Sequence, residues 1–77
     1  MLLGNYLSNI KKKYKNFFFS GIAFDSHQIK KNYIFFAIKG NRTDGNNFIS
    51  SAIHNGAKII ITEKKINGLK NGILFIQ

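Results

Sequence analysis

The stretch that decides the fold runs from residue 21 to residue 57 and reads GIAFDSHQIKKNYIFFAIKGNRTDGNNFISSAIHNGA. It contains two runs typical of strands, two polar loops and one stretch with helical periodicity. Each polar loop begins where a strand-like run ends, which is where open α/β sheets bind their ligands. We interpret the segment before it as a lead-in and the segment after it as an extension of the same sheet.

The centre of this stretch predicts a strand followed by a helix. Residues 33–38, YIFFAI, form an almost continuous apolar run, which is typical of a strand covered on both faces in a parallel sheet. Residues 46–55 carry apolar side chains at the spacing of one face of an amphipathic helix. These are Phe48, Ile49, Ala52 and Ile53.

Both ends of the predicted helix carry suitable capping residues. Asp44 is expected to be the N-cap, because its carboxylate accepts hydrogen bonds from the free amides of the first turn. Gly56 is suited to the left-handed conformation that ends helices, with Ala57 packing back. Residues 58–62, KIIIT, then predict a second buried strand. Strand, helix and strand together predict a right-handed βαβ unit with parallel strands 33–38 and 58–62.

The N-terminal part predicts a short helix and a short strand. Residues 1–10 have apolar side chains three and four positions apart, as in a helix. These are Leu2, Leu3, Tyr6, Leu7 and Ile10. The three phenylalanines 17–19 are expected to begin a strand or to pack under the sheet. Residues 21–25 predict a short strand with Ile22 and Phe24 on one face.

The C-terminal part predicts one more strand. Residues 63–71 form a polar, lysine-rich connection, and residues 72–77, GILFIQ, have the composition of a buried strand. The fold class expected is therefore α/β, with a small, mainly parallel sheet and helices. A chain of 77 residues allows one small domain, 1–77, and its end inside an apolar strand indicates a fragment of a longer protein.

Composition narrows the classes of function. Without cysteine there is no disulfide framework and no thiolate metal site, and no apolar run is long enough to span a bilayer. We therefore expect a cytoplasmic protein with no membrane partner. The formal charge of +9 raises nucleic acid as a partner. However, only Arg42 among the twelve basic residues is an arginine, and specific base or phosphate recognition prefers the arginine fork. We expect no specific nucleic-acid binding.

No catalytic constellation and no metal-binding spacing is present, and only three residues are acidic. The chemistry-bearing residues lie in loops 25–27 and 40–45, which share one sheet edge if their preceding strands are parallel neighbours. Ser26, Asn41, Arg42 and Thr43 then suit a nucleotide-sized anion, with Arg42 suited to a diphosphate. The alternative is that Asp25 and Ser26 form only a turn. His27 is expected to face solvent rather than to act as a pH switch or metal ligand.

A set of residues spread over half of the chain resembles the N-terminal domain of the Mur ligase family. The set comprises Asp25-Ser26, Ile34 to Ala37, Gly40, Asp44-Gly45, Phe48-Ile49, Ala52 and Gly56-Ala57. The MurE-type ligases, which add 2,6-diaminopimelate or lysine to UDP-N-acetylmuramoyl-L-alanyl-D-glutamate, are the closer likeness. The MurF type shares much of the set. His27 stands where the family usually has arginine, and residues 31–33 replace its usual Pro-Gly-Asp.

The resemblance implies a module that holds the UDP end of a UDP-N-acetylmuramoyl-dipeptide during peptidoglycan synthesis. By residue match, the substrate contacts are Phe24, Ser26, Asn41, Arg42 and Thr43. It further implies that the central and C-terminal domains are absent here and that ATP and Mg²⁺ bind there, so this chain has no cofactor and no catalytic residue and is inactive alone. The alternatives are a MurF-type domain and a small basic nucleic acid-binding module.

Overall fold

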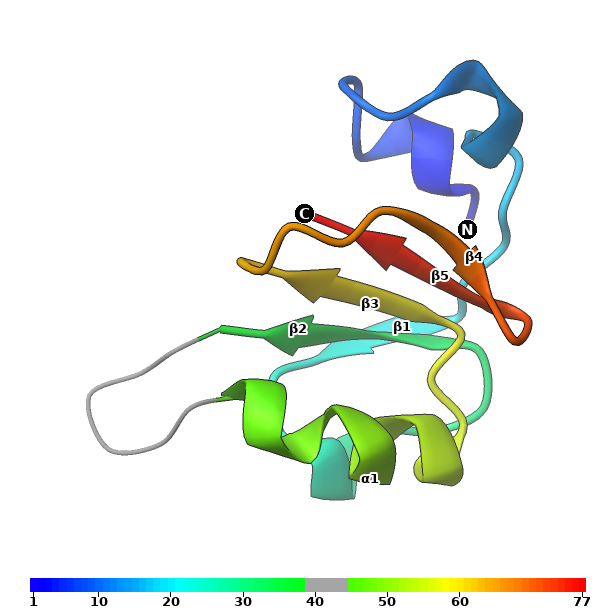
Figure 1. Ribbon diagram of the computed structural model, residues 1–77. Coiled ribbons are helices and arrows are strands. Elements are labelled where there is room, and N and C mark those ends of the chain that lie inside the picture. Colours follow the sequence, from blue (N-terminus) through cyan, green and yellow to red (C-terminus); the bar gives the residue numbers. More distant parts are fainter. Residues whose placement is uncertain (39–44) are drawn as a thin grey trace.

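The computed structural model describes residues 1–38 and 45–77, and its described strands form one five-stranded sheet (Figure 1). The strand order is β1-β2-β3-β5-β4. Only the β4–β5 pair is antiparallel, so the mainly parallel α/β sheet predicted from the sequence is confirmed. The strands are β1 Gly21–Ala23, β2 Tyr33–Ala37, β3 Ile59–Thr62, β4 Gly68–Lys70 and β5 Ile73–Ile76.

The predicted βαβ unit forms the middle of the sheet. Strands β2 and β3 are parallel neighbours, with Ile34 opposite Ile59 and Ala37 opposite Thr62. Helix α1, Ile49–Asn55, connects them and covers one face of the sheet (Figure 1). The continuous apolar runs are explained by burial on both faces, because adjacent residues of a strand point to opposite sides.

The start of the helical segment differs from the prediction. A 3₁₀ helix, η4, occupies Gly45–Phe48, and regular α-helix begins only at Ile49. Because a 3₁₀ helix has about three residues per turn, it rotates Phe48 away from the buried face. Phe48 is 38% exposed, whereas Ala52 is fully buried. The predicted N-cap, Asp44, lies outside the described residues.

The end of α1 is built as the sequence predicted. Gly56 has a φ angle of 123°, and its amide donates to the carbonyl of Ile53. The amide of Ala57 donates to the carbonyl of Ala52, and both alanines are buried. This pair of hydrogen bonds is the Schellman arrangement, which satisfies carbonyls left free at a helix C-terminus. It directs the chain straight into β3.

The sheet separates two apolar layers. The layer under α1 contains Phe35, Ile60 and Ala52, together with neighbouring small side chains. The opposite layer contains Ile34, Ile59 and Leu74 of the sheet and, from the N-terminal segment, Leu3 and Phe19. Figure 1 shows this N-terminal segment lying over the sheet on the side opposite α1. Both faces are therefore covered, as a parallel sheet requires.

The helix predicted over residues 1–10 is wrong. Residues 1–10 contain only a short 3₁₀ helix, η1 at Leu3–Asn5, and a second one, η2, follows at Lys12–Tyr14. The amide of Leu3 donates to the carbonyl of Phe17, and the amide of Gly4 donates to that of Lys15, each over 2.8 Å. These contacts between distant residues replace the hydrogen bonds that a helix would need. Of the three phenylalanines 17–19, Phe19 is fully buried and packs against the face of the sheet that the N-terminal segment covers.

Two further segments differ from their predicted form. Strand β1 ends at Ala23, and Ile22 and Phe24 share an exposed face. The predicted polar connection 63–71 contains strand β4, which forms a hairpin with β5. Asn71 and Gly72 join the two strands with φ angles of 52° and 81°, the two positive values that a type I′ turn requires. No described helix has the length and apolarity needed to cross a membrane.

Candidate functional site

The carboxyl ends of β1 and β2 meet at one edge of the sheet. Gly21 pairs with Tyr33 and Ala23 with Phe35 in a parallel register, so the segments after both strands leave from the same edge. The prediction of a ligand site at this edge assumed that the two strands are parallel neighbours, and that assumption is confirmed. Beyond β2, the amide of Gly45 donates to the carbonyl of Ile38 over 3.0 Å. The chain therefore returns to the end of β2 before α1 begins.

A tight turn follows β1. The 3₁₀ helix η3 comprises Ser26–Gln28, and Asp25 caps it, because its carboxylate accepts a 2.9 Å hydrogen bond from the amide of His27. Asp25 also accepts the amide of Gln28 through its backbone carbonyl. The predicted turn role of Asp25 is thus present. Ser26 is only 4% exposed.

The imidazole of His27 adds a second contact to the cap. Its Nδ1 lies 3.1 Å from Oδ1 of Asp25, and the His27 side chain is 86% exposed. The prediction that His27 faces solvent is confirmed. The backbone amide of His27, and after it the imidazole, lower the pKa of the Asp25 carboxyl because both stabilise its ionised form. The carboxylate therefore stays charged at neutral pH.

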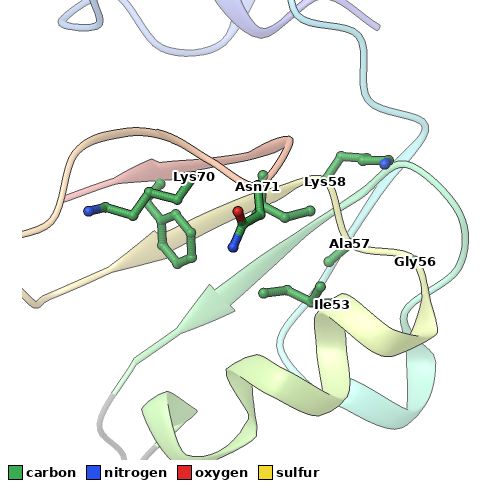
Figure 2. Close-up of a pocket in the computed structure, with 8 residues that line it drawn as sticks. Ile53, Gly56, Ala57, Lys58, Lys70 and Asn71 are labelled. Atoms are coloured by element: carbon green, nitrogen blue, oxygen red, sulfur yellow. The ribbon is translucent and has the colours of Figure 1, made fainter.

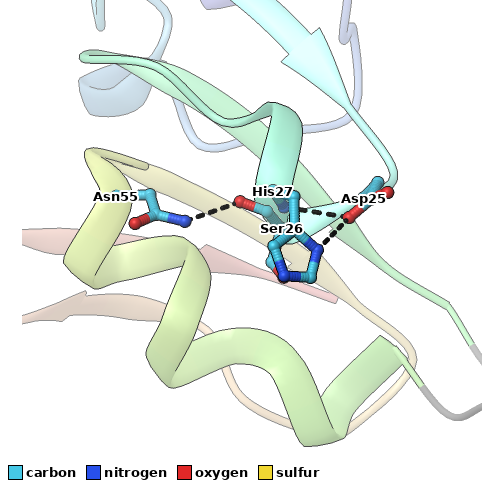
Figure 3. Close-up of polar contacts among 4 residues, drawn as sticks. All are labelled: Asp25, Ser26, His27 and Asn55. Atoms are coloured by element: carbon cyan, nitrogen blue, oxygen red, sulfur yellow. Dashed lines mark hydrogen bonds and ion pairs between the residues drawn. The ribbon is translucent and has the colours of Figure 1, made fainter.

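Helix α1 holds this turn from the other side. Nδ2 of Asn55 donates a 2.8 Å hydrogen bond to the carbonyl of Ser26, as Figure 3 shows. A hollow of about 440 Å³ lies where η3 meets α1. It is lined by Ser26, His27, Ser50, Ser51, His54 and Asn55. A smaller one, of about 210 Å³, lies between Asp25, Ser26, His27 and Phe48. Asn55 was not among the predicted site residues, because no local sequence pattern reveals a contact across 29 residues.

Phe24 lies on the other side of the sheet from these hollows. Its ring is stacked on that of Phe36, with centroids 4.9 Å apart, and Phe36 packs against the apolar layer under the N-terminal segment. Ser26 lies beside α1, on the opposite face. The two described site residues are thus two positions apart at one strand end, but they do not line one hollow. A ligand that touches both has to bend around the sheet edge.

The other three residues predicted for the site are Asn41, Arg42 and Thr43, and all three lie outside the described residues. Their role as substrate contacts stays a prediction. Among residues 1–38 and 45–77, no three histidine or acidic side chains gather as a metal site would need. The described part of the edge offers instead a capped turn, two histidines, serine hydroxyls and an exposed aromatic ring, a combination suited to a polar ligand with a planar group.

A further hollow, of about 530 Å³, lies elsewhere. It is open beside α1 at the amino ends of β3 and β5, opposite the edge where the site was predicted (Figure 2). Its lining includes the apolar residues Ile53, Ala57, Ile73 and Phe75 and the basic residues Lys58 and Lys70. Ligands of parallel sheets bind at carboxyl ends, so this hollow is not our candidate site.

Curated proteins with a similar sequence share one name. A diaminopimelate-adding ligase of Rickettsia typhi, UDP-N-acetylmuramoyl-L-alanyl-D-glutamate–2,6-diaminopimelate ligase, is 38% identical over 69 residues, which is 90% of this chain and 14% of that protein. The ligase of the same name from Fusobacterium nucleatum is 44% identical over 68 residues, 88% of this chain and 13% of that protein. The chain thus spans about one seventh of the length of these relatives.

A solved structure shares the fold. UDP-N-acetylmuramoylalanyl-D-glutamyl-2,6-diaminopimelate–D-alanyl-D-alanyl ligase from Acinetobacter baumannii superposes with a TM-score of 0.61 at 29% identity. The match covers 75% of this chain and 12% of that one. A family profile described as "Mur ligase family, catalytic domain" matches residues 19–72. This match spans more than half of the chain and includes β1, η3, β2, α1 and β3, so the chain belongs to the Mur ligase family.

Proposed function

We propose that residues 1–77 are a substrate-anchoring N-terminal domain of a MurE-type Mur ligase, and that this domain binds the UDP part of UDP-N-acetylmuramoyl-L-alanyl-D-glutamate. The observation that carries the proposal is the shared carboxyl edge of β1 and β2, where a capped turn follows one parallel strand beside the end of the next. The names of the curated relatives support the MurE type over the MurF type.

The described residues suggest how such a ligand is held. Ser26 lines both hollows beside η3 and presents a hydroxyl group, which can donate a charge-assisted hydrogen bond to a diphosphate oxygen. Phe24 offers an exposed ring at the same strand end. Asn41, Arg42 and Thr43 complete the proposed contacts from the neighbouring loop. These groups bind and orient the substrate, and none of them carries out a chemical step.

The reaction belongs to the complete ligase. We propose that ATP and Mg²⁺ bind to its other domains, where ATP activates the D-glutamate carboxylate for attack by the incoming amine, and that the whole protein works in the cytoplasm. The 77-residue chain then acts only through substrate binding and contacts with those domains. It is expected to show no ligase activity alone.

A titration of the chain with UDP-N-acetylmuramoyl-L-alanyl-D-glutamate, followed by NMR, tests the proposal. We expect amide shifts at residues 24–27 and 40–45, and Ser26→Ala should weaken binding about tenfold, the effect of losing one charge-assisted hydrogen bond. Ser8→Ala, at an exposed serine of the N-terminal segment, is the matched control. Equal shifts with AMP, or shifts centred on Lys11–Lys15, would show a generic phosphate patch and refute the proposal.

A further inference from the structure

We propose that Asn55 is a positioning residue for the turn after β1, and that it holds the peptide group between Ser26 and His27 in the orientation needed for substrate binding. The inference rests on the proposed function, because it assigns a role in that same site. Asn55 is the last residue of α1, and Figure 3 shows its side chain directed from the helix end toward the turn.

One peptide group is held at both of its ends. At one end, the carbonyl of Ser26 accepts the 2.8 Å hydrogen bond from Nδ2 of Asn55. At the other end, the amide of His27 donates its 2.9 Å hydrogen bond to the Asp25 carboxylate. A trans peptide is planar, with its C=O and N–H pointing in opposite directions. Fixing the carbonyl of Ser26 therefore also fixes the direction of the His27 amide.

Asn55 provides the shorter of two contacts to this carbonyl. The amide of Ile29 also donates to it, but over 3.4 Å, which is near the long limit for such a bond. Without Asn55, the carbonyl of Ser26 keeps only this long contact. The peptide group can then rotate, which moves both the His27 amide and the Ser26 side chain that lines the two hollows.

The C-terminal end of α1 is itself held by contacts with the segment before β2. This is required if Asn55 is to fix the position of the turn. The carbonyl of Gly56 accepts a 2.9 Å hydrogen bond from the amide of Asn32. An added Cβ at Gly56 would come within 2.8 Å of the Cα of Lys31, so the helix end and this segment are in close contact. The segment between β1 and β2 is thus attached to the last turn of α1 at Ser26 and again at Asn32.

If the Asn55 hydrogen bond only stabilised the fold, its loss would lower stability without changing the turn. The test therefore measures both substrate affinity and the conformation of the turn. The variants are Asn55→Ala and Asn55→Asp, the second of which keeps the size of the side chain but removes its donor. Asn5→Asp, at an exposed asparagine in η1, controls for the changed charge. Asn55→Gln keeps the amide and serves as the conservative variant, and circular dichroism confirms folding.

The first readout is the affinity for UDP-N-acetylmuramoyl-L-alanyl-D-glutamate. We expect Asn55→Ala and Asn55→Asp to weaken it by about three- to tenfold, the range for one hydrogen bond. Asn55→Gln should recover part of the loss, and Asn5→Asp should bind as the original chain does. Unchanged affinity in both Asn55→Ala and Asn55→Asp would overturn the proposal.

The second readout needs no ligand. In Asn55→Ala, the amide of His27 should exchange its hydrogen faster and shift in the NMR spectrum, and the pKa of Asp25 should rise toward its ordinary value because its main donor is less well held. If the original chain binds no substrate, the proposed function fails, and this readout still decides the role of Asn55. An unaltered His27 amide and Asp25 titration in that variant would refute it.

Discussion

The rings of Phe24 and Phe36 are stacked, with centroids 4.9 Å apart and planes 19° apart. Phe36 belongs to the buried strand β2, whereas Phe24 follows the edge strand β1 and is 68% exposed. The contact therefore holds a large, exposed aromatic surface in one place at the carboxyl edge. Stacked aromatic pairs contribute about 0.5–1.5 kcal/mol beyond the area that they bury.

Replacing this exposed ring should affect binding more than folding. Phe24→Ala is expected to weaken binding of UDP-N-acetylmuramoyl-L-alanyl-D-glutamate about fivefold or more, within the range for loss of an aromatic contact to a base. The free energy of unfolding in urea should fall by about 1 kcal/mol, the value of the stack. Phe18→Ala removes a phenylalanine that is 55% exposed and should leave affinity unchanged. Equal affinity for both variants would exclude Phe24 from the site.

Two phenylalanines should differ sharply in their contribution to stability. Phe19 is fully buried, and Phe19→Ala should lower the free energy of unfolding by about 3–5 kcal/mol through lost burial and a cavity. The helical pattern placed Phe48 in the core, but it is 38% exposed, so Phe48→Ala should cost about 1 kcal/mol. Urea denaturation of both variants measures the difference. A loss of about 3 kcal/mol for Phe48→Ala would instead indicate that Phe48 is buried, as the helical pattern predicted.

Alanine substitutions at two glycines with positive φ angles distinguish destabilisation by backbone strain from destabilisation by steric contact. Gly72→Ala, at φ 81° with no heavy atom within 4 Å of the new Cβ, should cost about 1–2 kcal/mol of strain. Gly56→Ala adds a contact of 2.8 Å to the backbone of Lys31, so its cost should exceed that of Gly72→Ala by at least ~1 kcal/mol. Thermal and urea unfolding measure both. Similar costs would mean that the Gly56–Lys31 approach relaxes easily.

The capping interaction of Asp25 should be detectable at acidic pH as a lowered pKa of its carboxyl group. Its pKa is lower in the folded chain than its ordinary value of 3.8, so its contribution to stability is present above that value and is lost as the pH falls through the lowered pKa. An NMR titration of the carboxyl carbon measures it. His27→Ala should raise the pKa only partly, because the largest cause is the backbone amide, which remains. An ordinary pKa in the original chain would contradict the observed cap.

The basic surface should give only weak binding to nucleic acid. Among the described residues, the lysines are divided among the N-terminal segment, the loop before β2, residues 58–65 and β4. Binding to DNA or RNA is then expected to be micromolar or weaker at ~0.15 M salt and independent of sequence. Fluorescence anisotropy with two unrelated oligonucleotides tests this. Sub-micromolar, sequence-selective binding would favour the nucleic acid-binding alternative over substrate anchoring.

The sequence predicted best where one pattern governs a whole element. Two apolar strand patterns in residues 33–62 flank one helical pattern that is closed by Gly56. The two strands, their parallel pairing and the end of the helix follow from this order. The pattern failed at the N-terminus. There the spacing of Leu3 and Leu7 fits a helix, but the backbone bonds with residues 15–17 and the contact of Leu3 with the sheet decide otherwise.

The missed hairpin and part of the site have different causes. Strand β4 has a single apolar residue, Leu69, so it lacks periodicity, although the Asn71-Gly72 pair was a readable turn signal. For the site, the sequence located Phe24 and Ser26 at the correct strand end. It did not reveal that they face opposite sides of the sheet, nor that Asn55 reaches Ser26, because both depend on how α1 docks.

The two edges of the described sheet differ in their protection against self-association. At one edge, the hairpin reverses the chain, so the final parallel strand is shielded by β4, which is short and carries Lys70. Short, charged edge strands discourage pairing with another molecule. At the other edge, β1 carries the exposed Ile22 and has no charged residue. Lateral aggregation of the isolated chain is therefore expected to begin at β1, and a lysine in place of Ile22 would be the first change to improve its solubility.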